Sequence, residues 1–225
     1  MTQGERWLAA TWPVVRAALP DPPALVVELG CGTVGGHVPM LLADGYEALG
    51  VDPEAPEGTE YRRIEFEHLE ERLPTEAAAI VASASLHHVE DPRDVADAMG
   101  RALAPGGRVI VVEWDWEAFD RPTSDWCFGR LGPDDDGGWL HRHRDAWAAS
   151  GTSWDEYLRS WAHEHRIHPA RELLALLAER FRLDPPVRRP YFFADLDGTT
   201  EEDEARAIDA GEIRAGRIDV VGTIS

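Results

Sequence analysis

One run, Leu-Val-Val-Glu-Leu-Gly-Cys-Gly-Thr-Val-Gly-Gly at residues 25–36, constrains the fold of this chain most. Its leading aliphatic residues are typical of a strand buried on both faces, as strands of parallel sheets are. Gly30, Gly32 and Gly35 then allow a tight turn and a close approach of the backbone to a ligand. Residues 38–43 have a helical pattern. The segment therefore predicts a strand, a glycine turn and a helix, the arrangement that cradles nucleotides.

Two acidic residues favour a ligand that contains a nucleoside. The glycine spacing fits the dinucleotide fingerprint, which by itself discriminates poorly between NAD(P) and other nucleosides. Glu28 lies just before the glycines, where a carboxylate can hold a ligand ammonium or hydroxyl. Asp52 follows a second predicted strand, at a position where an acid can accept both ribose hydroxyls. The alternative for Asp52 is a turn-capping role before Pro53.

Composition limits the partners. The chain has 225 residues, a formal net charge of −20 and no lysine. The acidity argues against nucleic-acid binding, and the missing lysine excludes Schiff-base chemistry. No stretch approaches the roughly 18 apolar residues of a membrane span, the N-terminus has no signal-peptide layout, and two cysteines make no disulfide framework. We therefore expect one cytoplasmic domain, without membrane or nucleic-acid partners.

The rest of the chain alternates strands and helices. Strands are expected at 25–27, 47–51, 61–66, 79–83, 109–112, 182–194 and 218–224. Helices are expected at 5–19 (one helix, or two divided at Pro13), 38–43, from 92 after the Asp-Pro start, at 145–149, at 154–164, from 169, and at 201–214. Since ligands of open α/β sheets lie at the carboxyl ends of strands, the stretch 83–89 should face the cleft.

Four motifs in order resemble the class I S-adenosylmethionine (SAM)-dependent methyltransferases, and in particular their type 11 small-molecule family. They are Glu-Leu-Gly-Cys-Gly-Thr from Glu28, Asp52, Leu-His-His-Val-Glu-Asp-Pro from Leu86, and Leu-Ala-Pro-Gly-Gly-Arg-Val-Ile-Val-Val-Glu from Leu103. The resemblance covers roughly residues 24–118. It implies a Rossmann-like, doubly wound α/β fold, with a mostly parallel seven-stranded sheet, an antiparallel last strand and a helical lid insert.

The same resemblance implies the cofactor contacts. The residues expected to contact SAM are Glu28, Gly30, Cys31, Gly32, Asp52, Glu67 and Ser83. Glu67 is chosen, with Glu65 as the alternative, because relatives carry an acid facing the adenine amino group at this place. The chain departs from the family at the start of the next strand, where it has alanines at 77–79 instead of the usual aspartate.

His88 and Glu113 are the candidate catalytic residues. The resemblance places both at the carboxyl ends of neighbouring core strands, beside the methyl group. Methyl transfer to a hydroxyl needs alignment and removal of a proton, for which an imidazole is suited. A carboxylate beside it would orient the ring and stabilise the imidazolium. The hypothesis is His88 as general base with Glu113 as its partner; the alternative is that the histidines only pack near the cofactor.

Residues 114–168 are rich in tryptophan and histidine and correspond to the lid insert. Trp116, Trp126 and His141 are the candidate substrate-binding residues, because aromatic walls suit a flat apolar or cationic molecule. The alternative is that these aromatics form a satellite core. The histidine spacing matches no specific metal site, so no metal is expected. The domain is divided into a helical cap (1–20), a cofactor core (21–113), the insert (114–168) and a C-terminal helix and strand hairpin (169–225).

The function expected from the sequence is methyl transfer from SAM to an oxygen of a small-molecule acceptor, a secondary or natural product. The acceptor is the expected partner, with a homodimer left open. Nitrogen or carbon acceptors and a non-methylating SAM enzyme are the nearest variants. An NAD(P)-dependent reductase is disfavoured, because the Tyr-x-x-x-Lys pair of short-chain reductases requires lysine. A SAM-binding regulatory protein without catalysis is the alternative outside the enzymes.

Overall fold

A single twisted sheet organises the computed structural model, which describes residues 2–133 and 137–224. Its strands are β1 (Leu25–Leu29), β2 (Glu47–Val51), β3 (Tyr61–Arg62), β4 (Ala77–Ser83), β5 (Leu103–Trp114), β6 (Phe181–Leu183), β7 (Val187–Arg189) and β8 (Arg217–Ile224). The order is β3-β2-β1-β4-β5-β8-β6, and β7 also pairs with β8. Strands β1 to β5 pair in parallel, whereas β8 is antiparallel to β5, β6 and β7. This confirms the predicted mostly parallel sheet with an antiparallel last strand.

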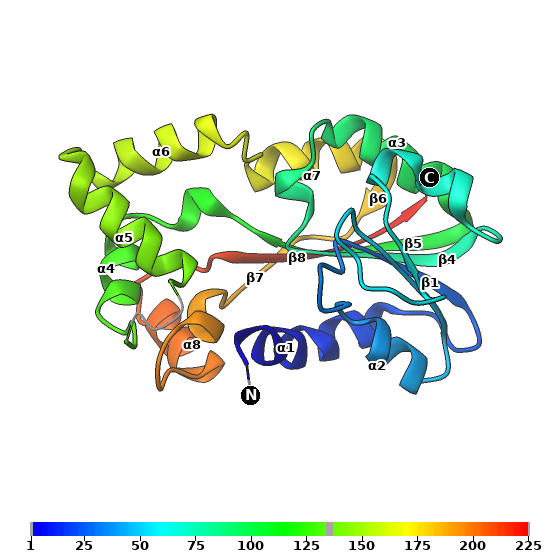
Figure 1. Ribbon diagram of the computed structural model, residues 1–225, viewed down its shortest axis with the longest axis horizontal. Coiled ribbons are helices and arrows are strands. Elements are labelled where there is room, and N and C mark those ends of the chain that lie inside the picture. Colours follow the sequence, from blue (N-terminus) through cyan, green and yellow to red (C-terminus); the bar gives the residue numbers. More distant parts are fainter. Residues whose placement is uncertain (1, 134–136, 225) are drawn as a thin grey trace.

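Helices cover both faces of the sheet, as a doubly wound fold requires. They are α1 (Gln3–Ala18), α2 (Val38–Ala43), α3 (Pro92–Ala102), α4 (Arg121–Phe128), α5 (Trp139–Ser150), α6 (Trp154–Glu164), α7 (Ala170–Ala178) and α8 (Glu201–Asp209). Figure 1 shows α1 and α2 on one face and α3 and α7 on the other. Each face has its own apolar core, because the strands are buried on both sides. None of these helices is long and apolar enough to cross a membrane.

Proline and glycine explain most differences from the predicted elements. The expected strand 182–194 is divided into β6 and β7, because Pro185 and Pro186 between them have no N–H to donate to a ladder. The expected helix 201–214 ends at Asp209, ahead of Gly211, whose φ is +73°. Helix α1 is continuous through Pro13, so the division considered there does not occur.

The insert contains one helix that the sequence analysis missed and one that is longer than expected. Helix α4 has a clear start signal that was overlooked, since Asp120 caps it by accepting a hydrogen bond from the backbone N–H of Thr123. Helix α5 begins at Trp139 rather than near 145. Together, α4, α5 and α6 stand beyond the carboxyl ends of the parallel strands, at one end of the molecule (Figure 1).

An aromatic core holds the insert together. Trp154 and Phe119 are almost completely buried, their rings meet edge to face at 4.9 Å, and the Trp154 indole N–H donates to the Phe119 carbonyl. Phe192, which lies outside the insert, packs against Phe119 at 4.6 Å. The satellite core considered as an alternative is therefore present, and it joins the insert to the C-terminal part of the chain.

The N-terminal helix is fastened to the same region. The Arg6 guanidinium donates to the backbone carbonyls of Phe193, Ala194, Leu196 and Thr199. Trp7, one residue on, meets the Tyr191 ring edge to face at 5.1 Å. Helix α1 therefore connects the cofactor half of the sheet with the segment that supports the insert.

Replacing Trp154 tests the insert core. We expect Trp154→Ala to lower the free energy of unfolding by about 3–5 kcal/mol, because it leaves a large cavity and an unpaired Phe119 carbonyl. Trp154→Phe should cost less, since it keeps most of the ring volume. Urea denaturation measures both, with Leu42→Ala on exposed α2 surface as a control expected to change stability by less than about 0.5 kcal/mol. Equal stability of Trp154→Ala and the wild type would contradict this account.

Candidate active site

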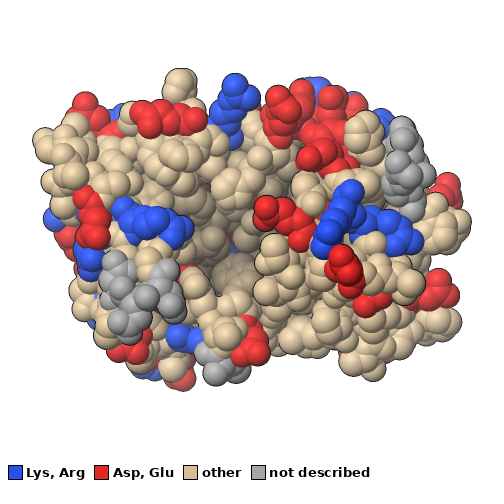
Figure 2. Space-filling model, viewed as in Figure 1, with Lys and Arg blue, Asp and Glu red and all other residues tan. Residues whose placement is uncertain are grey.

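Two adjoining cavities lie at the carboxyl ends of the parallel strands. The first has a volume of about 830 Å³ and is bordered by the glycine turn, Asp52, the 65–68 segment and the residues that follow β4. The second has a volume of about 610 Å³ and extends into the insert. Ala84 and His88 border both cavities. Figure 2 shows a hollow in the middle of this face, between the insert on the left and the core on the right.

The glycine turn needs its glycines for two different reasons. Gly30 has a φ of +81°, and a Cβ there would lie 2.2 Å from the Cβ of Ser85, so only glycine fits beneath the loop after β4. Gly32 also has a positive φ, but a Cβ there would meet no atom within 4 Å. Gly32 borders the first cavity, and its backbone is therefore open to a ligand.

Asp52 lies at the end of β2 and is already oriented by the backbone. One carboxylate oxygen accepts the Gly32 N–H at 3.0 Å and the other accepts the Glu54 N–H at 2.7 Å. The carboxylate still borders the first cavity. Asp52 thus joins the glycine turn to the cavity wall, where its remaining lone pairs can accept hydroxyl donors.

The other expected cofactor residues separate into two groups. Glu67 borders the first cavity, together with Glu65. Cys31 and Ser83 are buried and do not border that cavity. Burial is the main cause that raises the pKa of the Cys31 thiol to about 12, so it stays protonated. The Ser83 hydroxyl accepts the Trp7 indole N–H at 3.3 Å.

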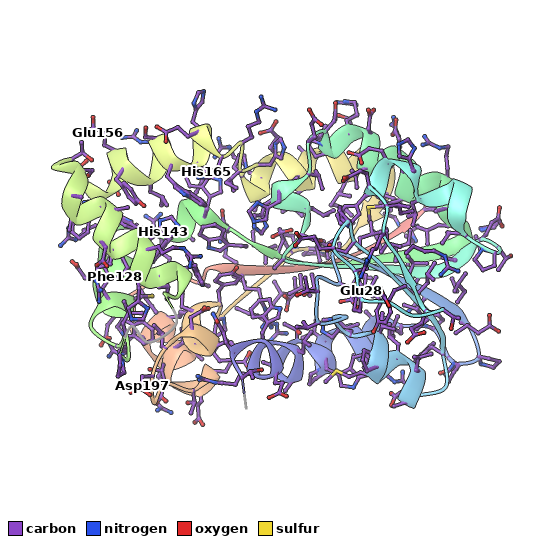
Figure 3. The ribbon with its side chains drawn as sticks, in the orientation of Figure 1. Glu28, Phe128, His143, Glu156, His165 and Asp197 are labelled. Carbon is purple, nitrogen blue, oxygen red and sulfur yellow. The ribbon has the colours of Figure 1, made fainter. Side chains whose placement is uncertain are left out.

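Glu28 is buried and faces its own chain. Its carboxylate accepts the backbone N–H of His37 at 2.6 Å and pairs with the His37 ring Nδ1 at 2.8 Å. The other ring nitrogen of His37 lies 2.9 Å from the Thr11 hydroxyl on α1. Glu28, labelled in Figure 3, therefore holds the end of the glycine turn and links it to α1. Through this network it shapes the first cavity without bordering it.

Glu113 is hydrogen-bonded to His87, whereas the sequence analysis paired it with His88. The Glu113 carboxylate lies 2.5 Å from His87 Nδ1 and also accepts the backbone N–H groups of Leu86 and Trp114. Burial opposes ionisation of this carboxyl, but His87 and the two amides together lower its pKa. Of the two adjacent histidines in the turn Leu86–His88, His87 is the one that is bonded to the carboxylate.

His88 instead occupies the boundary between the cavities. Its ring lies 4.0 Å from the His87 ring, centroid to centroid, and is open to solvent along the cavity walls. Desolvation by the surrounding protein is the main cause that lowers the pKa of His88 to about 4, and the neighbouring His87 is the second cause. His88 is therefore neutral at physiological pH. Ala84, which precedes this turn, has a φ of +50°, so the backbone at the boundary is held in a strained conformation.

The second cavity has aromatic walls, but they are not the residues that the sequence analysis selected. Its aromatic residues are Trp114, Trp139, Trp161, Tyr157 and Tyr191, with His87, His88, His143 and His165 between them. Trp116 and Trp126 border two separate surface hollows. His141 is buried, and its ring contacts the Gly132 carbonyl. Nothing in the sequence distinguishes the tryptophans that border the cavity from those that do not, because all of them lie within residues 114–168.

The described histidines of the insert are not clustered as metal ligands. Among residues 2–133 and 137–224, no group of three or more His, Cys, Asp or Glu side chains is arranged to hold a metal ion. His143 and His165, labelled in Figure 3, come from α5 and from the residue after α6. His143 is fixed by a 3.1 Å contact between its Nδ1 and the Tyr157 hydroxyl.

Comparison with known proteins decides the family. Residues 6–181 match the family model described as a methyltransferase domain. The chain belongs to this methyltransferase family. The parallel core and the antiparallel last strands agree with this assignment.

Two curated relatives show how far the sequence likeness extends. The ubiquinone biosynthesis O-methyltransferase of Idiomarina loihiensis is 26% identical over 137 residues, covering 53% of this chain and 54% of the relative. The protein of the same name from Dechloromonas aromatica is 33% identical over 100 residues, covering 38% and 42%. The chain thus spans about half the length of the curated relatives it matches.

Solved structures extend the likeness over nearly the whole chain, at the level of the fold. A SAM-dependent methyltransferase from Mesorhizobium loti has a TM-score of 0.57 at 20% identity, covering 95% of this chain and 97% of that one. An N-methyltransferase from Bradyrhizobium japonicum in complex with S-adenosylhomocysteine (SAH) has a TM-score of 0.52 at 14% identity, covering 99% and 88%. Identities this low establish the shared fold alone.

The residues that border the first cavity fit SAM. The open backbone at Gly32 leaves room for the methionine part, and Asp52 offers carboxylate oxygens to ribose hydroxyls. Glu65 and Glu67 border the same cavity.

Replacing Asp52 tests this assignment. We expect Asp52→Asn to weaken SAH binding about ten-fold or more, because a charged hydrogen-bond acceptor is lost. Isothermal titration calorimetry measures the dissociation constant. Asp44→Asn, which alters only a surface ion pair with Arg16, serves as the control and should bind SAH as the wild type does. Wild-type affinity in Asp52→Asn would remove Asp52 from the cofactor site.

A buried acid behind the second cavity predicts a pH effect on stability. Asp195 accepts the Trp139 indole N–H, and burial is the main cause that raises its pKa to about 7. An unfolded aspartate ionises near pH 4. Between about pH 4 and 7 the folded state therefore keeps a proton that the unfolded state releases, and this group lowers stability as the pH rises.

Asp195→Asn should remove that contribution. We expect the free energy of unfolding of the variant, relative to that of the wild type, to be higher at pH 8 than at pH 5 by about 1 kcal/mol or more. Urea denaturation of both proteins at the two pH values measures the difference. A constant difference across the window would show that Asp195 ionises normally in the folded state.

Proposed function

We propose that this protein transfers the methyl group of SAM to an oxygen of a small-molecule acceptor bound in the second cavity. The observation that carries the proposal is the buried Glu113–His87 pair, whose His87 borders that cavity beside His88. The curated relatives that the chain resembles are named as O-methyltransferases, and this likeness supports the same kind of acceptor atom.

The pair is arranged as a base and its orienting group. Because Nδ1 is bonded to an ionised carboxylate, His87 carries its proton on Nδ1. The lone pair on Nε2 is then free to accept a proton. SAM, when bound, supplies an electrophilic methyl group on its sulfonium. When the acceptor hydroxyl takes up that methyl group, His87 Nε2 would accept the hydroxyl proton. Glu113 then stabilises the imidazolium.

His88 has a positioning role in this proposal. Its neutral ring lies between the two cavities, where it can accept or donate a hydrogen bond to the acceptor and separate the acceptor from solvent. His87 is hydrogen-bonded to the Glu113 carboxylate, which can orient its ring and stabilise an imidazolium. The base role assigned to His88 from the sequence therefore moves to its neighbour, and Glu113 keeps its role as partner.

Residues 114–168 are proposed to be the cover of the acceptor site. Helices α5 and α6 carry six of the residues that border the second cavity, namely Trp139, Arg142, His143, Ala146, Tyr157 and Trp161. Trp116, Trp126 and His141, expected from the sequence, support this cover from outside the cavity. Enclosure of the acceptor excludes water and strengthens the electrostatic interactions on which the pair depends.

Variants of the pair test the mechanism. An acceptor is first identified by measuring SAH release with a panel of phenols, alcohols and amines. On that acceptor, we expect His87→Gln and Glu113→Gln to lower kcat about 10²–10⁴-fold, as loss of a general base does. The dissociation constant for SAH should stay within a factor of about three, which shows that the fold and cofactor site are intact.

His88→Gln separates the two assignments. We expect it to raise KM for the acceptor more than it lowers kcat, because His88 positions the acceptor without taking the proton. Full loss of kcat in His88→Gln, with activity retained in His87→Gln, would restore His88 as the base. Methylation of amines alone within the panel would contradict an oxygen acceptor.

A further inference from the structure

Resting on the proposed function, we propose that the acceptor is a planar aromatic hydroxy acid, and that Arg142 binds its carboxylate. The second cavity combines aromatic walls, a guanidinium from Arg142 at its rim, and the His87 and His88 rings at the strand ends. These three features match the three parts of such a molecule: an aromatic ring, an acidic group and a hydroxyl that receives the methyl group.

The aromatic walls favour a flat ring. Trp114 and Tyr191 are stacked, with their planes 13° apart and their centroids 5.8 Å apart. Trp139 and Trp161 meet Trp114 at steep angles, with centroids at 5.5 Å and 6.1 Å. Ring faces and edges are thus presented from several directions, as aromatic ligands prefer. The volume of about 610 Å³ suits a small molecule of one or two rings.

Arg142 is the positive charge of this cavity. Among the described residues that border the cavity, it is the only Arg, and no Asp or Glu borders it. His88 and His143, both with pKa values near 4, add no charge at physiological pH. Burial is the first cause of the low pKa of His143 and the charge of Arg142 is the second, which places the guanidinium within electrostatic reach of this wall.

The guanidinium of Arg142 is available for a ligand. It donates to the Gly137 carbonyl, and it forms no ion pair with a carboxylate of residues 2–133 or 137–224. By contrast, Arg144 on the same helix pairs with Asp145. In a chain with 42 acidic and 22 basic residues, an arginine that borders a cavity and pairs with no carboxylate of the described residues is a specific feature.

The guanidinium of Arg142 favours a carboxylate on the ligand. Its planar array of N–H donors matches a carboxylate with two parallel hydrogen bonds. A cationic amine would meet repulsion from Arg142, and no carboxylate borders the described cavity to offset it. Although aromatic walls alone would also suit a cation, the added positive charge favours an anion.

Matched ligands measure this preference. The probes are 3,4-dihydroxybenzoate, its methyl ester and 3,4-dihydroxyphenethylamine, which share a catechol ring and differ in charge. Binding to the SAH-loaded protein is measured by calorimetry and by quenching of tryptophan fluorescence. We expect the acid to bind at least about ten-fold more tightly than the ester or the amine, as a charged hydrogen-bonded pair predicts.

Arg142→Gln should remove the preference, so that acid and ester bind equally, while SAH binding is unchanged. Arg144→Gln, two residues along the same helix, is the matched control and should keep the wild-type preference. Undetectable binding of the acid at millimolar concentration, tighter binding of the ester or amine, or an unchanged preference in Arg142→Gln would each overturn the assignment.

These results are separable from the proposed function. Methylation of a neutral phenol that depends on His87, without any preference for acids, would keep the proposed function and reject the role of Arg142. Tight binding of the acid through Arg142 without methyl transfer would keep the anion site and reject oxygen methylation.

Discussion

Two buried carboxylates near the ends of central strands control the geometry of the site. Glu28 in β1 and Glu113 in β5 are 1% and 2% exposed. A buried carboxylate is costly unless hydrogen bonds satisfy it, and each of these is satisfied by a histidine ring and by backbone N–H groups of a following or neighbouring turn. Glu28 thereby holds the glycine turn at His37, and Glu113 holds the turn that contains His87. The same interactions that stabilise the core therefore position the walls of both cavities.

Aromatic side chains of the insert form both its buried core and part of the wall of the second cavity. Trp154 and Phe119 form its buried core, whereas Trp139 and Trp161 line the cavity beside Trp114. Since the insert extends beyond the main sheet, it needs this separate core to hold its cavity-lining rings in place. Arg142 comes from the same helix as Trp139, so the charge and the aromatic wall are positioned together.

Much of the cofactor half was predictable because it depends on local pattern. The glycine spacing, the acid after β2 and the Asp-Pro helix start each correspond to a backbone requirement within a few residues. Glu67 and Asp52 both border the first cavity. The pairing of Glu113 was not predictable, because His87 and His88 are adjacent and of one type, and only the direction of each side chain separates them. For the same reason Trp116 and Trp126 could not be distinguished from Trp139 and Trp161.

The sequence by itself determined the class of fold and the nucleoside-type cavity, since buried strands, glycine turns and helix caps are read over short stretches of chain. Tertiary structure alone decided which histidine meets Glu113, that the Glu28 carboxylate faces His37, and which aromatic rings and which arginine share the second cavity. The physical reason is that these contacts join residues far apart in the chain. Their partners are set by how helices pack beyond the ends of the sheet, and no local pattern records that packing.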